Sequence, residues 1–234
     1  MRSAGGGDGS DPDKCPVLAV IFDLDGVIVD SEPVWERIRR QVVAENGGTW
    51  RADSQRRLMG MSTAEWSKYL SEDLGVGMAP DAVATLVIAR MSAGYRDQVQ
   101  LMPGAAEAVR RMAVRWPLGL ASSSPPDLID AALEGAGLTG MFATILSTEQ
   151  VDRGKPAPDV YLAAAHSLGF APEGCAAVED SANGLRSAAA ARTHVIAVPH
   201  PRYPPDASAL AAAELVLTGL GELTVDAVCG LGSR

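Results

Sequence analysis

The main pattern along the chain is an alternation of short apolar runs with longer amphipathic segments. The apolar runs have the length of buried strands, and they fall at Leu18–Phe22, Leu118–Ala121, Ala143–Leu146, Cys175–Val178, His194–Val198 and, more briefly, Leu215–Leu217. Segments with a helical pattern follow most of these runs, at Ala105–Trp116, Asp127–Gly135, Asp159–Leu168 and Ala182–Arg192. Strands that alternate with helices predict an α/β fold with a parallel sheet covered on both faces. Ligands of such sheets bind at the carboxyl ends of the strands.

One long stretch, residues 33–101, breaks this alternation. It has a helical pattern throughout and no β-rich run, with candidate helices at Glu36–Asn46, Thr63–Leu74 and Pro80–Gln98. We interpret it as a helical cap inserted after the first strand, above the active end of the sheet. The alternative is that these helices pack on one face of the core. The predicted organisation is a tail at residues 1–14, a core formed by residues 15–32 and 102–234, and a cap at residues 33–101.

Composition limits the partners and the location. Acidic residues outnumber basic ones, 29 to 20, which gives a formal charge of −9 and argues against nucleic acid or an anionic membrane as a partner. No apolar run is long enough to span a bilayer, and the Gly- and Asp-rich start does not resemble a signal peptide, so we expect a disordered tail and a cytoplasmic protein. Cys15, Cys175 and Cys229 are widely spaced and are predicted to be free thiols in a reducing compartment. The three histidines are scattered, which argues against a zinc site.

Two carboxylates, Asp23 and Asp25, follow directly after the first apolar run, in a predicted turn that Gly26 allows. An unpaired carboxylate is costly to bury, and a divalent cation would neutralise the pair while leaving an oxygen free to attack an electrophile. The pattern Asp-x-Asp is a weak signal alone, because it also occurs in helix caps and exposed turns.

Three later segments add polar groups after other strand-like runs. Ser122, with the backbone N–H groups beside it, is a candidate for holding phosphate oxygens, although a serine-rich loop more often serves as a helix cap. Lys155 lies between a glycine and a proline and would supply a fixed cation, although most lysines are merely solvated. Asp180, with Glu179 beside it, would complete the oxygen shell of a magnesium ion, or would only favour the start of a helix.

Together these four segments resemble the haloacid dehalogenase superfamily of phosphohydrolases. The matching residues are Asp23-Leu24-Asp25-Gly26-Val27, Ser122, Gly154-Lys155-Pro156-Ala157-Pro158-Asp159 and Glu179-Asp180-Ser181, in the order of the family, and the similarity covers nearly the whole chain after Cys15. The resemblance implies a Rossmann-like parallel-sheet core with a helical cap, dependence on Mg²⁺ and an aspartyl-phosphate intermediate.

The resemblance also implies roles for the two acids of the first motif. Asp23 would be the nucleophile and a magnesium ligand. Asp25 would protonate the leaving oxygen and then activate water, with its backbone carbonyl on the metal. An acid at this position excludes dehalogenases, phosphonatases and transport ATPases, so phosphoryl transfer is the expected chemistry.

For the other motifs, the resemblance implies binding roles. Ser122, together with Ser123, and Lys155 would hold the phosphoryl group of the substrate. Asp180 would ligate magnesium, and Glu179 would do so directly or through water.

Three longer stretches are similar to the hexitol phosphatase and 2-deoxyglucose-6-phosphate phosphatase group, which implies hydrolysis of a small phosphorylated sugar or sugar alcohol. They are Asp30-Ser31-Glu32-Pro33-Val34-Trp35, Leu120-Ala121-Ser122-Ser123-Ser124-Pro125 and Val178-Glu179-Asp180-Ser181-Ala182-Asn183-Gly184. The alternative is a β-phosphoglucomutase, which shares the core motifs. That family uses a histidine and an arginine in the cap, where this chain has Trp35 and Thr63. A catalytically idle phosphosugar sensor has no support, because every catalytic position is filled.

Substrate choice is expected to lie in the cap, because the core contacts only the phosphate. Trp35, Trp66 and the turn at residues 60–63 are candidates, and simple packing is at least as good an explanation for the two tryptophans. Glu32 and Arg37 would touch a hydroxyl or phosphate, or form surface ion pairs. We expect a monomer whose only partner is a small phosphorylated metabolite.

Overall fold

Six parallel strands form one sheet in the order β3-β2-β1-β4-β5-β6. The computed structural model describes residues 15–58 and 61–232, so the tail predicted at residues 1–14 and Gly60 of the cap turn lie outside the described residues. The strands are β1 (Ala19–Phe22), β2 (Leu118–Ser122), β3 (Thr144–Ser147), β4 (Cys175–Glu179), β5 (His194–Ala197) and β6 (Leu215–Val216). Each predicted strand is present, with either end shifted by at most one residue. The α/β prediction is therefore confirmed.

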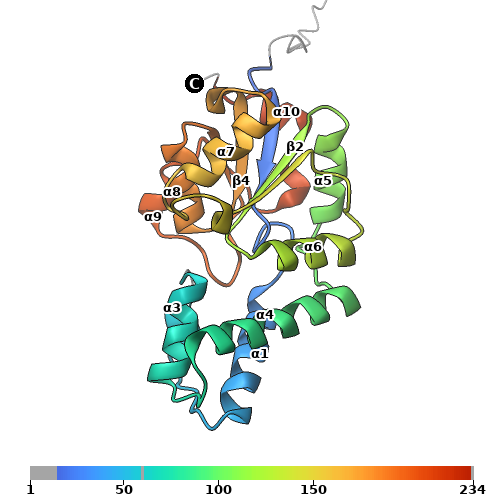
Figure 1. The fold of residues 1–234 in the computed structure, drawn as a ribbon. Coiled ribbons are helices and arrows are strands. Elements are labelled where there is room, and N and C mark those ends of the chain that lie inside the picture. The colour runs from blue at the N-terminus through green and yellow to red at the C-terminus, as the bar shows by residue number, and fades with distance from the viewer. Residues whose placement is uncertain (1–14, 59–60, 233–234) are drawn as a thin grey trace, which may run out of the picture.

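Helices cover both faces of this sheet (Figure 1). Side chains alternate between the faces along β1, so Val20 and Phe22 belong to one apolar cluster and Ala19 and Ile21 to the other. The first cluster includes residues of α5 (Ala105–Ala113), α6 (Pro126–Gly135) and α10 (Val225–Cys229). The second includes residues of α7 (Asp159–Leu168), α8 (Ala182–Ala190) and α9 (Ala207–Leu210). A strand buried on both sides must be apolar at every position, which is why β1 reads Ala-Val-Ile-Phe.

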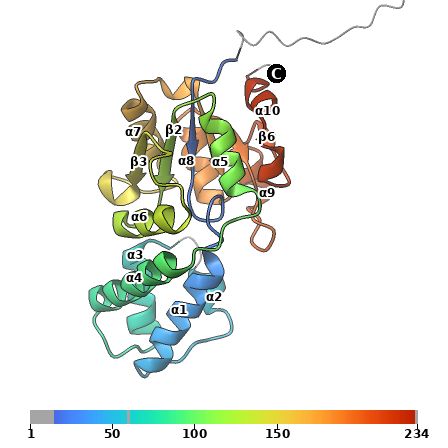
Figure 2. The ribbon, with the colours of Figure 1, turned by 90° about the vertical axis from the view of Figure 1, so that its right-hand side faces the viewer.

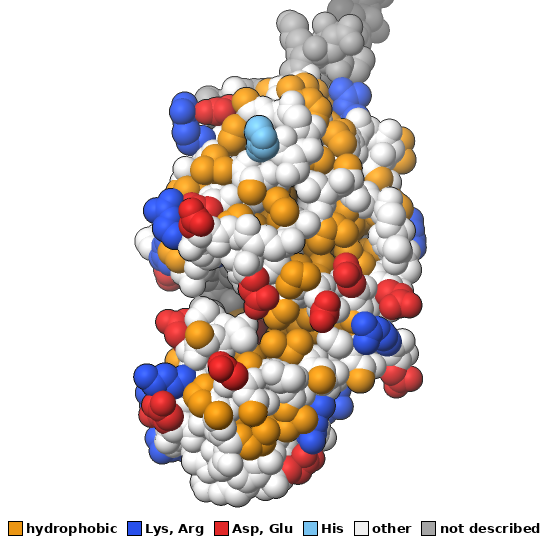
Figure 3. All heavy atoms as spheres, viewed as in Figure 1, with side chains coloured by type: hydrophobic (Ala, Val, Ile, Leu, Met, Phe, Trp, Pro, Cys, Tyr) orange, Lys and Arg blue, Asp and Glu red, His pale blue; other side chains and the backbone are white. Residues whose placement is uncertain are grey.

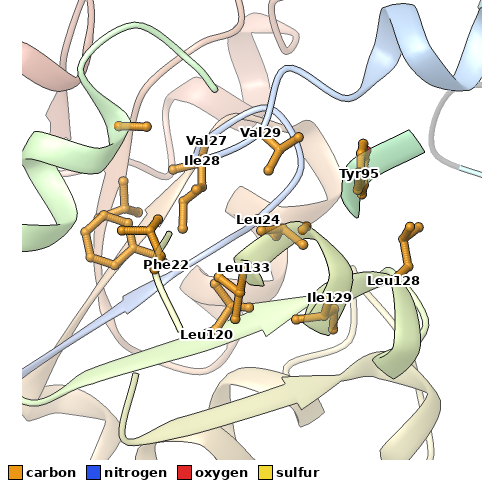
Figure 4. Packing of buried hydrophobic residues seen from close by; sticks show 14 of the residues in the cluster. Phe22, Leu24, Val27, Ile28, Val29, Tyr95, Leu120, Leu128, Ile129 and Leu133 are labelled. Atoms are coloured by element: carbon orange, nitrogen blue, oxygen red, sulfur yellow. The ribbon is translucent and has the colours of Figure 1, made fainter. Parts of the chain in front are cut away.

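The larger cluster continues from the sheet to the turn that carries the acidic motif. Figure 4 shows Phe22, Leu24, Leu120 and Leu133 gathered between β1, β2 and α6. Leu24 lies between Asp23 and Asp25 in the sequence and is fully buried. Its burial fixes the backbone between the two carboxylates, so their positions are set by the core and not by solvent.

Four helices lie together below the sheet in Figures 1 and 2. They are α1 (Glu32–Glu45), α2 (Ser54–Leu58), α3 (Thr63–Lys68), which continues as a π-helix (Tyr69–Asp73), and α4 (Pro80–Asp97). The two connections to them are paired, because the Asp30 N–H donates to Gln100 O at 2.9 Å and the Met102 N–H donates to Ile28 O at 2.9 Å. We call α1–α4 the cap below. The exact limits 33–101 stay a prediction.

A glycine allows the cap to approach the core closely. A Cβ on Gly135, at the end of α6, would overlap the backbone carbonyl oxygen of Tyr95 on α4. Because the contact is with backbone, it cannot be relieved by a change of rotamer. This position therefore needs glycine for the observed packing of α4 on α6.

The prediction of three free thiols is wrong for two of them. A disulfide bond joins Cys15, just before β1, to Cys229 at the end of α10, and Cys175 is a buried free thiol. These two positions are 214 residues apart in sequence, and no local pattern indicates that they meet. The cysteine argument for a reducing compartment therefore does not hold.

The face shown in Figure 3 carries acidic and basic side chains intermixed, without a continuous basic patch. Large apolar side chains exposed on the described surface are scattered along the chain: Leu18, Val114, Ile145, Leu162 and Val216. Such single residues are ordinary on a protein surface. Within residues 15–58 and 61–232, no helix is both long and apolar enough to cross a membrane.

Candidate active site

The predicted catalytic groups meet at the carboxyl edge of the sheet. Asp23 follows β1, Ser122 ends β2 and Glu179 ends β4, and these three strands are neighbours. The Asp23 N–H donates to Val178 O at 3.0 Å, so the hydrogen bonds between β1 and β4 continue as far as Asp23. Parallel pairing thus places together side chains from positions 23, 122 and 179, which are far apart in the sequence.

Lys155 reaches into this edge from the loop before α7. Its Nζ lies 2.6 Å from Asp23 Oδ1, 2.6 Å from Glu179 Oε1 and 2.9 Å from Ala121 O, and its side chain is only 5 % exposed. An ammonium group has three donors, so these three acceptors satisfy it. The contact also orients Asp23, because it uses Oδ1 and leaves Oδ2 unengaged by the lysine.

Glu179 is fully buried behind this contact, and both of its oxygens are occupied. Oε1 accepts from Lys155 and from the Tyr161 hydroxyl at 2.7 Å. Oε2 accepts from the Asp180 N–H at 3.1 Å and from the Ser181 hydroxyl at 3.2 Å. Glu179 therefore holds Lys155 and the turn before α8 in place.

Asp25 is held by two serine hydroxyls at the end of β2. Ser124 Oγ donates to Asp25 Oδ2 at 2.7 Å, and Ser122 Oγ lies 3.4 Å from the same oxygen. Ser122 Oγ also accepts from the Ser124 N–H at 3.0 Å. The other oxygen, Asp25 Oδ1, is buried without a hydrogen-bond partner in the described part of the chain. One oxygen of Asp25 is thus fixed while the other is unpaired.

Three buried carboxylates are close enough together to hold a metal ion. One oxygen from each of Asp23, Glu179 and Asp180 lies within 4.8 Å of the others. Asp180 Oδ1 is buried and has no hydrogen-bond partner among the described residues. Gly26, at φ +85°, leaves room beside it, because a Cβ there would overlap the Asp180 carboxylate. An all-oxygen donor set of this kind fits a hard divalent cation.

The charges of this cluster do not balance without a further cation. Burial raises the pKa of Asp23 to about 8, although Lys155 opposes the change. Burial and the neighbouring Glu179 and Asp23 raise the pKa of Asp180 well above its usual range. Burial alone would lower the pKa of Lys155, but Asp23 and Glu179 outweigh it and raise the pKa. The lysine is therefore charged, and it cannot by itself neutralise all of the surrounding carboxylates in their ionised form, which is why the pKa values of Asp23 and Asp180 are raised.

A cavity of about 770 Å³ lies next to these groups and is lined by residues of both the core and the cap. This volume is typical of sites for small molecules. Of the predicted residues, the wall includes Asp23, Asp25, Ser123, Lys155 and Asp180. Ser122 and Glu179 are fully buried and do not line it. The structure thus brings all seven predicted residues into one cluster but places two of them behind the wall.

The cap contributes a polar and aromatic wall to the same cavity. Trp35 and Trp66 pack edge to face with ring centroids 5.9 Å apart, and both line the cavity. Glu32 lines it as well and accepts from Gln55 Nε2 at 2.7 Å. Arg37 is exposed and does not line it. The two tryptophans therefore pack against each other and also form part of the cavity wall.

Several residues of the site were not identified from the sequence. Ser124 holds Asp25 more closely than Ser122 does, and Tyr161 supports Glu179 from α7. His200, whose ring stacks on Tyr203, lines the cavity from the loop after β5. Arg39 lies in the cap wall. The only signals in the sequence are a third consecutive serine and a tyrosine six residues after Lys155, and neither is specific.

Comparison with known proteins shows similarity in sequence and in fold. The model of the haloacid dehalogenase-like hydrolase family matches residues 17–192. Hexitol phosphatase B of Escherichia coli strain K12 is 35 % identical over 221 residues, covering 92 % of this chain and 97 % of that protein. The crystal structure of a putative β-phosphoglucomutase from Thermotoga maritima is 29 % identical with a TM-score of 0.72, covering 88 % of this chain and 96 % of that one. The structure of CbbY from Rhodobacter sphaeroides in complex with phosphate has a TM-score of 0.81 at 24 % identity, covering 91 % and 99 % of the two chains.

Proposed function

This chain belongs to the haloacid dehalogenase-like hydrolases and is a phosphatase, and from that premise we propose that it hydrolyses monophosphates of small sugars or sugar alcohols through a phosphorylated Asp23. The observation that carries the proposal is the contact of Lys155 with both Asp23 and Glu179, next to a cavity that core and cap residues line together. The 35 % identical hexitol phosphatase B, matched over nearly its full length, supports the substrate class.

Asp23 is suited to nucleophilic attack because Lys155 fixes it. With Oδ1 bound to the ammonium, Oδ2 forms the bond to phosphorus while the bond from phosphorus to the leaving oxygen breaks. Lys155 has its three protons satisfied by protein groups, so it acts by position and charge. A buried positive charge that needs no reorganisation stabilises the negative transition state.

Asp25 is placed to move the proton in both halves of the reaction. It gives its proton to the leaving alkoxide, and the resulting carboxylate then takes a proton from water as that water attacks the phosphorus of phosphorylated Asp23. The second step breaks the bond between Asp23 and phosphorus and releases inorganic phosphate. Ser124 and Ser122 keep the carboxyl group oriented through Oδ2.

A magnesium ion is the metal that best suits the carboxylate cluster. Asp23 and Asp180 line the cavity and would hold it, and the family resemblance adds the backbone carbonyl of Asp25. When bound, the ion supplies charge neutralisation and a Lewis acid for the phosphoryl oxygens. Glu179 would act from behind, because both of its oxygens already accept hydrogen bonds from protein groups.

The mutase alternative shares the core chemistry and differs in the cap. The similarity to the Thermotoga maritima structure supports this alternative. Position 35, however, holds a buried tryptophan packed on Trp66. An indole offers no group for acid–base exchange with a sugar hydroxyl. Phosphatase activity is therefore the function we propose.

The direct test is release of inorganic phosphate from a panel of hexose, hexitol and pentose monophosphates, with Mg²⁺ and with a chelator. Magnesium-dependent release from the sugar or sugar-alcohol phosphates is the expected result. β-Glucose 1-phosphate is followed for isomerisation in the same assay. Isomerisation without phosphate release would replace the phosphatase proposal with the mutase.

Metal binding is expected to stabilise the protein more at pH 8 than at pH 5. The pKa values of Asp23 and Asp180 are raised by burial, so the folded cluster holds protons that unfolded carboxylates lose near pH 4. This cluster therefore contributes stability at low pH that is lost as the pH rises toward about 8, the raised pKa of Asp23. Mg²⁺ competes with those protons and relieves the repulsion at high pH.

The measurement is the thermal midpoint with Mg²⁺ and with a chelator at both pH values. Asp180→Asn should reduce the shift and raise the magnesium concentration needed for activity. Asp130→Asn, an exposed site on α6, is the control and should behave as the wild type. A shift of the same size at both pH values would count against this account of the cluster.

The monomeric state and the cytoplasmic location stay predictions. The disulfide between Cys15 and Cys229 removes one argument for the location, and size-exclusion chromatography tests the oligomeric state.

A further inference from the structure

Arg39 is a buried arginine in the cap wall of the cavity. It lies on α1, is 5 % exposed and lines the same cavity as the catalytic acids Asp23 and Asp25. Its guanidinium carbon lies 4.4 Å from the centroid of Trp35 and 5.1 Å from that of Trp66. The two indoles thus fix the plane of the guanidinium group.

The guanidinium group is not fully satisfied by the protein. Arg39 Nε is buried and has no hydrogen-bond partner in the described residues. Burial lowers the pKa of Arg39 to about 10, with Glu32 and Asp25 opposing the change, so the group is charged at neutral pH. A buried donor of this kind is costly unless a ligand pairs with it.

The charge of Arg39 is offset within the same wall. Glu32, also on α1, lines the cavity, and burial raises the pKa of its carboxyl group while the charge of Arg39 opposes that rise. Gln55 holds Glu32 through a 2.7 Å hydrogen bond. With Asp25 nearby as well, the wall has no net positive charge to attract a second anionic group. A fixed donor beside a fixed acceptor instead matches hydroxyl groups, which both accept and donate.

We propose that Arg39 is a specificity-determining residue that donates hydrogen bonds to hydroxyl oxygens of the leaving group. With Glu32 accepting beside it, the site selects uncharged polyhydroxy leaving groups over those with a second phosphate or a carboxylate. This inference rests on the proposed phosphatase function and identifies the residue that recognises the sugar part of the substrate.

The experiment compares wild type with Arg39→Met, Arg39→Lys and the control Arg37→Met, an exposed site on the same helix. The substrates are a hexitol monophosphate, a hexose bisphosphate and phenyl phosphate, which has no hydroxyl on its leaving group. Methionine suits the space between two indoles, but removing the cation near Glu32 is expected to cost some stability, so each variant has to be folded under the assay conditions. Thermal unfolding of each variant checks this.

For Arg39→Met we expect kcat/KM for the hexitol monophosphate to fall by about 10- to 100-fold, chiefly through KM, as for the loss of a hydrogen bond to a charged group. For phenyl phosphate the change should stay within about 3-fold, because the transferring phosphoryl group is untouched. Arg39→Lys should remain impaired, since lysine lacks the planar fork. The wild type should prefer the monophosphate to the bisphosphate.

Three results would overturn the inference while leaving the phosphatase intact. They are an equal loss on all substrates with Arg39→Met, full activity of Arg39→Lys on the hexitol monophosphate, and a wild-type preference for the bisphosphate. Hydrolysis of phenyl phosphate by a wild type that is inactive on every sugar phosphate would contradict the proposed substrate class itself. The two failures are thus distinguishable.

Discussion

Asp23→Asn is expected to lower phosphate release by at least about 10⁴-fold, a loss typical of removing a covalent nucleophile. The amide keeps the shape of the carboxylate, so its oxygen can still accept from Lys155 Nζ at the position where Oδ1 accepts now. It cannot form the phosphorylated intermediate. The effect should appear in kcat for every substrate, because this residue acts on the phosphorus and not on the sugar.

Folding should not suffer from this substitution. Burial raises the pKa of Asp23 to about 8, which means that its charge costs stability in the metal-free protein. A neutral amide removes that cost, so the thermal midpoint should not fall by more than about 3 °C. Phosphate release and thermal unfolding are measured on the same preparation, with Asp130→Asn as the matched control. Activity of pure Asp23→Asn within about 100-fold of wild type would exclude Asp23 as the nucleophile.

The elements of the core were predicted well because each one satisfies a local rule. The helix predicted at Asp159–Leu168 is observed with these bounds, since Pro158 precedes it and Gly169 ends it in the left-handed region. β1 was found as an unbroken apolar run, which a strand buried on both faces requires.

Predictions in the cap were less complete, because its structure depends on packing between short elements. The helix expected at Thr63–Leu74 is instead α3 followed by a π-helix, in which the Leu74 N–H donates to Tyr69 O, five residues earlier. The short helix α2 was not predicted at all. Five residues are too few to show a helical period.

Within the site, residue type was predictable and orientation was not. Two strand ends and a loop lysine were enough to expect that Asp23, Lys155 and Asp180 meet. No pattern could show that Glu179 faces inward, that Ser124 reaches Asp25, or that Arg39 turns from the cap toward the cavity. Those facts depend on contacts between segments far apart in sequence, as does the disulfide between Cys15 and Cys229.

Lys155→Met should abolish activity and also destabilise the protein, unlike Asp23→Asn. The substitution leaves Asp23 Oδ1 and Glu179 Oε1 buried without the cation that contacts both at 2.6 Å. Breaking a buried ion pair by removing one partner costs about 3–5 kcal/mol. Loss of the fixed charge near the transferring phosphoryl group should lower kcat by about 10³-fold or more.

The destabilisation should depend on pH with a definite sign. Lys155 opposes the rise in the pKa of Asp23 that burial causes, so in the variant that pKa rises further. Protonation then neutralises Asp23 as the pH falls, and the difference in unfolding free energy from wild type should shrink between pH 8 and pH 5. Urea unfolding at the two pH values, in the presence of a chelator, measures it.

Lys68→Met provides the matched control, because Lys68 is 65 % exposed and its Nζ lies 3.9 Å from Oε2 of Glu72, which is 59 % exposed. Its loss should change the unfolding free energy by less than about 0.5 kcal/mol at either pH. A Lys155→Met variant that is as stable as wild type at pH 8, or equally destabilised at both pH values, would mean that the lysine does not neutralise the buried carboxylates. The ion pair of Lys155 with Asp23 Oδ1 would then no longer support the proposed mechanism, in which it orients the carboxylate for attack by Oδ2.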